Sequence, residues 1–112
     1  MIFNLAVEIV RWVKDYQPGI VACELVDADG RRHTFIEKLP IVTAEWLDAA
    51  SPYPQPGTIQ CEVLARWQDT CGREQVRIST ERPYAIESAE GLSVFIVLAT
   101  QLSVTPGEAS YK

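Results

Sequence analysis

Two segments of this chain follow the same pattern. Residues 17–36 read QPGIVACELVDADGRRHTFI, and residues 55–78 read QPGTIQCEVLARWQDTCGREQVRI. Each begins with Gln-Pro-Gly, places Cys-Glu four and five residues after the glycine, and continues to an Asp-x-x-Gly-Arg sequence followed by an alternating stretch. Asp and Gly at these spacings are typical of the tight reversal in a β-hairpin. The pattern therefore predicts two equivalent hairpins, and it constrains the fold more than the chemistry.

Alternating apolar and polar residues predict further strands around these hairpins. The expected strands cover residues 2–14, 20–26, 31–38, 58–68, 73–80, 84–87 and 92–104. Residues 92–104 carry apolar side chains on both faces, which favours a central position in the sheet. Residues 43–50 combine a capping threonine with good helix formers and predict one short helix. The proline-rich residues 51–57 are expected to form a surface connection within one domain.

Length and composition favour a single all-β domain. A chain of 112 residues, with 47% hydrophobic and 22% charged residues, can bury a core without disulfides or a metal. We expect a small single-domain barrel or a two-sheet sandwich of about seven antiparallel strands, with two equivalent hairpins and one short helix. Barrel closure is favoured because it hides the edges of apolar strands. The domain is expected to cover residues 1–104, followed by a frayed C-terminal tail at residues 105–112.

The register of each hairpin depends on the length of its loop. In the second hairpin, a four-residue loop at 69–72 pairs Ala65 with Val76 and Val63 with Ile78, which keeps one face apolar, and we predict this register. A loop one residue shorter would set Ala65 against Arg77. In the first hairpin, a short glycine-bulged loop pairs Cys23 with Phe35, whereas a longer loop pairs Cys23 with Thr34. The sequence leaves these two registers open.

The charge of the chain limits the partners that it can bind. The chain has 15 Asp and Glu residues against 10 Lys and Arg residues, a formal net charge of −5. Domains that bind nucleic acid through its phosphates carry a basic surface, so nucleic acid is not an expected partner. The apolar stretch at residues 92–104 is too short and too polar to cross a bilayer, so no membrane association is expected. An acidic surface favours a basic partner instead.

The three cysteines and one histidine do not match a metal site. No two cysteines have Cys-x-x-Cys spacing, so we predict neither a zinc site nor any cofactor. Free thiols fit a reducing compartment, and we expect a cytoplasmic protein. Cys23 and Cys61 are interpreted as small buried apolar residues, whereas Cys71 lies in a turn and is interpreted as a surface thiol.

A candidate polar cluster comprises His33, Glu24 and Glu62. His33 would lie near Cys23 if the short loop forms, in the outline of a Cys-His nucleophile pair. That pair would need an exposed thiol and an orienting carboxylate, so a histidine with one hydrogen bond is the favoured interpretation. The two glutamates occupy matched positions, and pairing with arginines on a solvated face is favoured over acid–base catalysis. We therefore predict no catalytic residues.

Aromatic residues near the proline-rich connection form a candidate protein-binding surface. Trp12 belongs to this aromatic set, and the predicted binding residues are Trp46, Tyr53, Pro54, Trp67 and Tyr84. The leading hypothesis is a small non-enzymatic binding or accessory module that engages a protein partner. One alternative is an acidic inhibitor or immunity-type protein that neutralises a basic enzyme such as a nuclease. Another is a small hydrolase-like enzyme that uses His33 or a cysteine.

Overall fold

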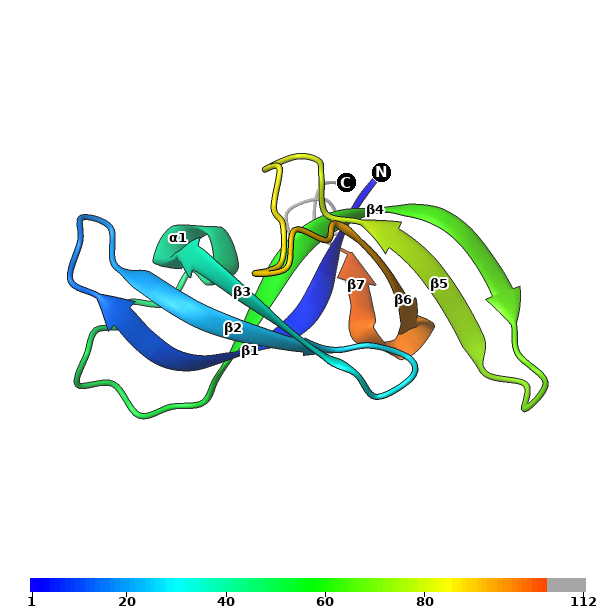
Figure 1. Cartoon of the computed structure of the whole chain (residues 1–112), viewed down its shortest axis with the longest axis horizontal. Coiled ribbons are helices and arrows are strands. Elements are labelled where there is room, and N and C mark those ends of the chain that lie inside the picture. The colour runs from blue at the N-terminus through cyan, green and yellow to red at the C-terminus, as the bar shows by residue number, and fades with distance from the viewer. Residues whose placement is uncertain (105–112) are drawn as a thin grey trace, which may run out of the picture.

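The computed structural model describes residues 1–104, which form one strongly curled antiparallel sheet (Figure 1). Its strands are β1 (Ile2–Lys14), β2 (Ile20–Val26), β3 (Arg32–Lys38), β4 (Gln55–Gln68), β5 (Glu74–Ser79), β6 (Val94–Leu98) and β7 (Leu102–Val104). Two short helical segments accompany them, α1 (Leu39–Val42) and the 3-10 turn η1 (Ala99–Gln101). The hydrogen-bonded order is β3-β2-β1-β4-β5-β6, and β7 pairs with β1. The predicted tail at residues 105–112 lies outside the described part of the chain.

Strand β1 is the shared element of the sheet. Its residues 2–9 pair with β4 on one side. On the other side, residues 3–5 pair with β7 and residues 8–14 pair with β2. The ladder between β1 and β2 shifts register twice, between Ile9 and Arg11 and between Trp12 and Lys14. Such bulges increase strand twist, which helps the sheet to curl around its own inner face.

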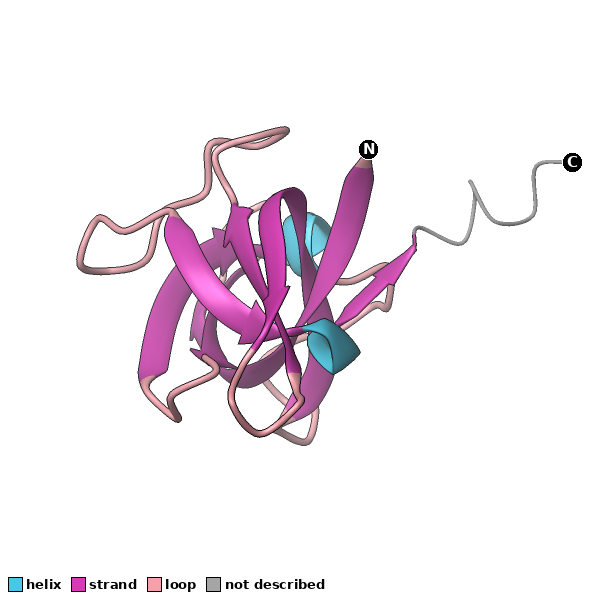
Figure 2. Ribbon diagram, turned by 90° about the vertical axis from the view of Figure 1, so that its right-hand side faces the viewer, coloured by secondary structure: helices cyan, strands magenta, loops and turns pink. Residues whose placement is uncertain are grey.

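The two end strands of the sheet approach each other through turns and side chains. The Ala28 N–H donates to the carbonyl of Ile96 on β6 at 2.9 Å, and the Ala89 N–H donates to the carbonyl of Thr34 on β3 at 2.7 Å. Inside, the ring of Phe95 lies 5.6 Å from that of Phe35. The result is a half-barrel wrapped around one interior (Figure 2). The all-β prediction is confirmed, and the single continuous sheet corresponds to its barrel alternative.

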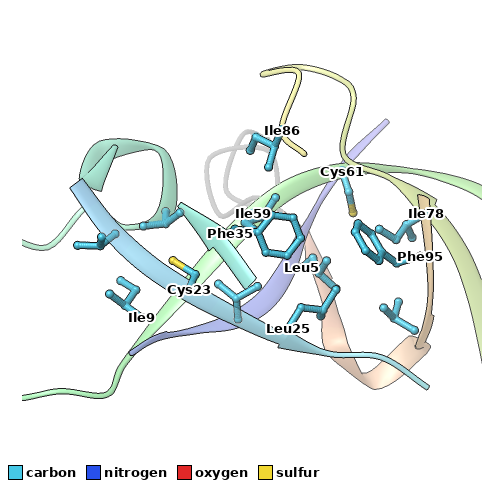
Figure 3. Close-up of a cluster of buried hydrophobic side chains, with 14 of the residues drawn as sticks. Leu5, Ile9, Cys23, Leu25, Phe35, Ile59, Cys61, Ile78, Ile86 and Phe95 are labelled. Carbon is cyan, nitrogen blue, oxygen red and sulfur yellow. The ribbon is translucent and has the colours of Figure 1, made fainter. Parts of the chain in front are cut away.

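Alternate residues of every long strand point into this interior. Leu5, Ile9, Leu25, Phe35, Ile59 and Ile78 are fully buried, as Figure 3 shows for the cluster. Cys23 and Cys61 lie among them, on β2 and β4. The prediction that these two cysteines are small buried core residues is therefore confirmed.

The two Asp-x-x-Gly-Arg turns have the same hydrogen bonds. In each, the aspartate N–H donates to the carbonyl of the arginine four residues later, at 2.9 Å, and the glycine N–H donates to the aspartate carbonyl, at 3.0 Å. Oδ1 of Asp27 and Oδ1 of Asp69 each accept two further backbone N–H groups. Both glycines have a φ near +84°, which L side chains rarely adopt. Both hairpins therefore use the short glycine-bulged loop.

This shared turn decides both registers. The first hairpin pairs Cys23 with Phe35, which was one of the two alternatives. In the second hairpin the predicted four-residue loop is wrong near the turn, because Ala65 pairs with Arg77. A register shift between Val63 and Ala65 then restores the predicted pairing of Val63 with Ile78. The chain thus keeps its apolar face by inserting a bulge rather than by lengthening the loop.

The predicted helix at residues 43–50 is wrong. The only turn of α-helix in the described chain lies earlier, at Leu39–Val42, and ends at Thr43. In the following segment, side chains bind nearby backbone instead: Thr43 Oγ1 accepts the Glu45 N–H, and Asp48 Oδ1 accepts the Ala50 N–H. Such local bonds compete with helix formation and favour an ordered loop.

Three further predictions near strand boundaries need correction. The strand expected at 92–104 is divided into β6, η1 and β7, and β6 lies at one end of the sheet rather than centrally. The Gln101 side chain accepts the Leu98 N–H and donates to the carbonyl of Val26, which turns the chain so that β7 reaches β1.

Residues 84–87 form no strand. The second Gln-Pro-Gly lies inside β4 and pairs with β1, whereas the first belongs to a turn.

Candidate functional site: an acidic aromatic cleft

A cleft of about 490 Å³ lies at one end of the half-barrel. One wall is the β1–β2 turn at residues 15–19, and the other is α1 with the loop that follows it as far as Asp48. Figure 1 shows this turn, α1 and this loop together on the left, opposite the β4–β5 turn. Three aromatic residues and three carboxylates line it: Trp12, Tyr16, Trp46, Asp15, Glu45 and Asp48. We call this site the acidic aromatic cleft.

The first wall is built around Trp12, near the end of β1. Its indole Nε1 donates to Oδ1 of Asp15 at 2.6 Å, which fixes the ring relative to the turn. The ring lies against Gly19, where an added Cβ would come within 2.0 Å of it. The carbonyl of Gly19 accepts the Leu39 N–H at 2.9 Å and so ties this turn to α1. The glycine of the first Gln-Pro-Gly motif therefore joins the two walls.

The second wall is a loop that side-chain hydrogen bonds hold in shape. The Tyr53 hydroxyl donates to the carbonyl of Asp48 at 2.7 Å, and the Asp48 N–H donates to Oγ of Ser51 at 2.9 Å. Burial, with the nearby Asp48, raises the pKa of Tyr53, so its hydroxyl stays a proton donor at neutral pH. The loop carries Trp46, of which 89% is exposed, the highest fraction for any large apolar residue in residues 1–104.

The cleft lining is negatively charged. It contains three carboxylates, and none of the lining residues is a lysine, arginine or histidine. Leu39, Leu47, Ala44 and two prolines contribute apolar surface to the lining, and Gln17 and Thr43 are its uncharged polar residues. Its volume falls within the range of small-ligand sites, about 300 to 1,000 Å³. The arrangement suits a group that is apolar along its length and cationic at one point.

The structure divides the predicted aromatic surface between three places. Trp46 lines the cleft, and Tyr53 and Pro54 lie on or beside the loop that supports it. Trp67 lies near the end of β4, where it pairs with Gln75, and Tyr84 is exposed in a separate turn. Sequence reasoning included Trp12 but missed Tyr16 and Asp15 of the turn, and Glu45 and Asp48 of the loop. Proximity to the Gln-Pro-Gly turn was the only available signal for the first two.

The residues of the candidate polar cluster do not meet. Glu24 pairs with Glu8 of β1 and binds Arg32 at 3.0 Å. Glu62 on β4 lies opposite Ile2 of β1. Ile2 and Glu8 are six positions apart on β1, which is about 20 Å along the strand, so the two glutamates lie at distant points of the sheet. His33 faces the interior, where its Nε2 lies 2.8 Å from Oδ2 of Asp27. The ring of His33 also packs edge-on against that of Phe95, with 4.8 Å between the centroids.

The two buried thiols are poor nucleophiles. Burial, with the charge of Glu37, raises the pKa of Cys23 to about 12, and burial raises the pKa of Cys61 to about 11. A thiol attacks as its thiolate, which is scarce at such pKa values. Cys71 is exposed in the β4–β5 turn. Within residues 1–104, no three His, Cys, Asp or Glu side chains are grouped so that they could hold a metal ion.

Comparison with family models, curated proteins and solved structures found no significant match to this chain. Among the described residues, no helix combines the length and apolar character needed to span a membrane. The side chains of the cleft are therefore the basis for a functional assignment.

Proposed function

We propose that this protein is a small non-enzymatic binding module and that it engages a protein partner through the acidic aromatic cleft. The single observation that carries the proposal is Trp46, which is 89% exposed on an ordered loop at the rim of the cleft. Tryptophan is enriched among the residues that dominate binding energy, and truncating such a residue costs about 2 kcal/mol or more. A loop held by its own hydrogen bonds presents this ring without a large ordering cost on binding.

The charge supports a basic partner surface. The chain carries a net charge of −5, and three carboxylates lie in the cleft. Complementary charge speeds association and excludes acidic competitors. The same observation favours a second candidate function, an acidic inhibitor that neutralises a basic enzyme. In that case many exposed ion pairs carry the contact and the affinity should fall steeply with salt, whereas a contact centred on Trp46, with only a few charge pairs inside the cleft, should fall much less.

The hydrolase-like alternative has weaker support. Its thiol candidate Cys23 is fully buried, with a pKa raised to about 12. Its histidine candidate, His33, is mostly buried and bonded to Asp27. Neither group lines the cleft. A cytoplasmic location remains a prediction from the free thiols.

Capture of binding partners by the immobilised protein tests this proposal. The variants are Trp46→Ala and, as a matched control, Trp67→Ala at the end of β4 away from the cleft. We expect the same partner to be captured by the wild type and by W67A at low and high ionic strength, and to be lost with W46A. Equal melting temperatures would show that W46A is folded. Equal capture by W46A would overturn the proposal, and loss of capture at high salt in the wild type would favour the inhibitor function.

A further inference from the structure

We infer that the acidic aromatic cleft binds an alkylammonium group, in the form of a lysine side chain of the partner. This inference rests on the proposed function and specifies the chemistry of its contact. The cleft combines the two features that recognise such a group: aromatic faces, which attract cations, and carboxylates, which neutralise them. The aromatic rings come from the end of β1, the β1–β2 turn and the loop after α1.

The chain itself shows that one of these rings accepts an ammonium group. Nζ of Lys14 lies 5.3 Å from the centroid of the Tyr16 ring and 3.5 Å from the Tyr16 hydroxyl. This is a cation–π contact between two exposed residues, two positions apart in the sequence. Lys14 is therefore both a model for the proposed contact and a competitor for it.

At two of the three cleft carboxylates, existing hydrogen bonds favour the single contacts of a lysine over the paired contact of an arginine. Arginine prefers to bind both oxygens of one carboxylate through its planar fork. Oδ1 of Asp15 already accepts the Trp12 indole, and Oδ1 of Asp48 already accepts the Ala50 N–H. The Oδ2 of each makes no hydrogen bond among the described residues, whereas Oδ1 of Asp48 also accepts a second bond, from the Ser51 hydroxyl. An ammonium group makes separate single contacts and fits such a set, while its alkyl stem packs on Leu39 and Leu47.

Charge complementarity selects a cation against a neutral group of the same shape. The lining contributes up to three negative charges and no positive one. A purely apolar ligand would cover the carboxylates without pairing them, which is costly. The cleft should therefore distinguish a trimethylammonium compound from the isosteric compound in which a tert-butyl group replaces it.

Titration of the full chain with choline and with its neutral tert-butyl isostere tests this inference. The indole N–H signals in NMR spectra report binding, with Trp12 and Trp46 in the cleft and Trp67 as an internal control. We expect choline to shift the first two signals, the isostere to leave all three in place, and N-acetyl-lysine amide to compete with choline. Trp46→Ala and Glu45→Gln should each weaken choline binding about fivefold. Lys14→Gln should strengthen it about twofold.

Two results would overturn the inference. One is equal binding of choline and its neutral isostere, which would make the cleft a simple apolar site. The other is that neither choline nor the lysine derivative binds. If partner capture still depends on Trp46 in that case, the binding module stands and only the ammonium contact fails. If choline binds as expected but W46A captures partners as well as the wild type, the proposed function fails instead.

Discussion

Gly19 is the residue on which the shape of the cleft most depends. An added Cβ would lie 2.0 Å from the ring of Trp12, so a side chain at this position must displace the indole or the turn. The same residue accepts the Leu39 N–H, which ties the turn to α1. Because Gly19 has no side chain, the Trp12 ring can pack against its backbone, and its carbonyl links the β1–β2 turn to α1.

We predict that Gly19→Ala lowers the free energy of unfolding by about 1 to 3 kcal/mol, the usual cost of overpacking. Denaturant unfolding measures this loss, and near-UV circular dichroism should show a changed Trp12 environment. Gly30→Ala is the matched control: its φ of +84° makes alanine strained, but nothing lies within 4 Å of its Cβ. That variant should lose stability without a near-UV change. An unaltered near-UV spectrum in G19A would contradict the packing described.

His33 has a structural role in the β2–β3 turn that no sequence motif indicates. Its Nε2 must donate to Oδ2 of Asp27, because an ionised carboxylate only accepts. Its Nδ1 is buried without a hydrogen-bond partner among the described residues. In the second hairpin, Gln75 makes the corresponding bond to Oδ2 of Asp69 at 2.8 Å. A glutamine side chain therefore makes the equivalent hydrogen bond to the turn aspartate.

We therefore predict that His33→Gln is tolerated far better than His33→Ala. The alanine variant leaves Asp27 without its partner and should lose about 2 kcal/mol. The glutamine variant restores a donor at the same place and removes the unpaired nitrogen, so its loss should be at most half as large. Chemical denaturation of both variants measures the difference. Equal losses would show that the two turns are not interchangeable, and a specific loss of cellular function in a stable H33Q would revive the enzymatic alternative.

At the scale of elements, the aspartate turns account for the hairpins. Each aspartate closes its turn through one carboxylate oxygen and binds a side chain six positions later through the other. Hydrogen bonds from Gln75 and from the Arg73 N–H lower the pKa of Asp69 to about 2. Burial alone would raise the pKa of Asp27, but bonds from His33 and from two backbone N–H groups bring it below its ordinary value.

These pKa values set the direction of a pH effect. A carboxylate whose pKa is lowered by folding stabilises the protein above its unfolded pKa of about 4, and this contribution disappears as pH falls through the folded value. We predict that the wild type loses stability between pH about 4 and about 2, and that Asp69→Asn shows a smaller loss in this window. Urea unfolding at several pH values measures the free energy of unfolding of both proteins across this window. Asp29→Asn is the matched control, because this side chain lies exposed in the other turn. An unchanged acid profile in D69N would refute the assignment.

At the scale of the whole molecule, Phe95 closes the half-barrel. Its ring contacts Phe35 and His33 of β3, the strand at the opposite end of the sheet, although β3 and β6 share no ladder. The contact between β3 and β6 therefore depends on side chains and on two backbone bonds from turns, while β7 returns to β1 through a ladder of its own. Since every strand contributes to one interior, both hairpins should unfold together.

We predict that Phe95→Ala lowers the free energy of unfolding by about 3 to 5 kcal/mol, the cost of a large cavity in a core. Ile96→Thr, on the exposed face of the same strand, should change it by less than about 0.5 kcal/mol. Far-UV circular dichroism and tryptophan fluorescence, recorded on the same samples, measure both. Separate transitions by the two probes in the wild type would show that the hairpins are independent units.

The sequence by itself determined the positions of the hairpins and most of the inward faces of their strands. Beyond the bulge in β4 the predicted face is wrong, because Ala65 lies opposite Arg77. These features arise from local chemistry: strand alternation selects buried faces, and Asp and Gly at fixed spacing close turns with their own atoms. It also grouped Trp46 with other aromatic residues in one predicted surface, but Trp67 and Tyr84 lie away from the cleft that Trp46 lines.

Only the tertiary structure decided where the last strand breaks, how the sheet closes and which residues meet in the cleft. Each of these depends on contacts between distant segments, such as Gly19 with Leu39 and Gln101 with Val26. The bulge near Leu64 and the loop after Thr43 are further cases, because apolar alternation favoured a longer turn at the first and local propensity favoured a helix at the second. Residues far apart in a chain acquire a common environment only when the whole sheet has curled, and no spacing in the sequence encodes that curvature.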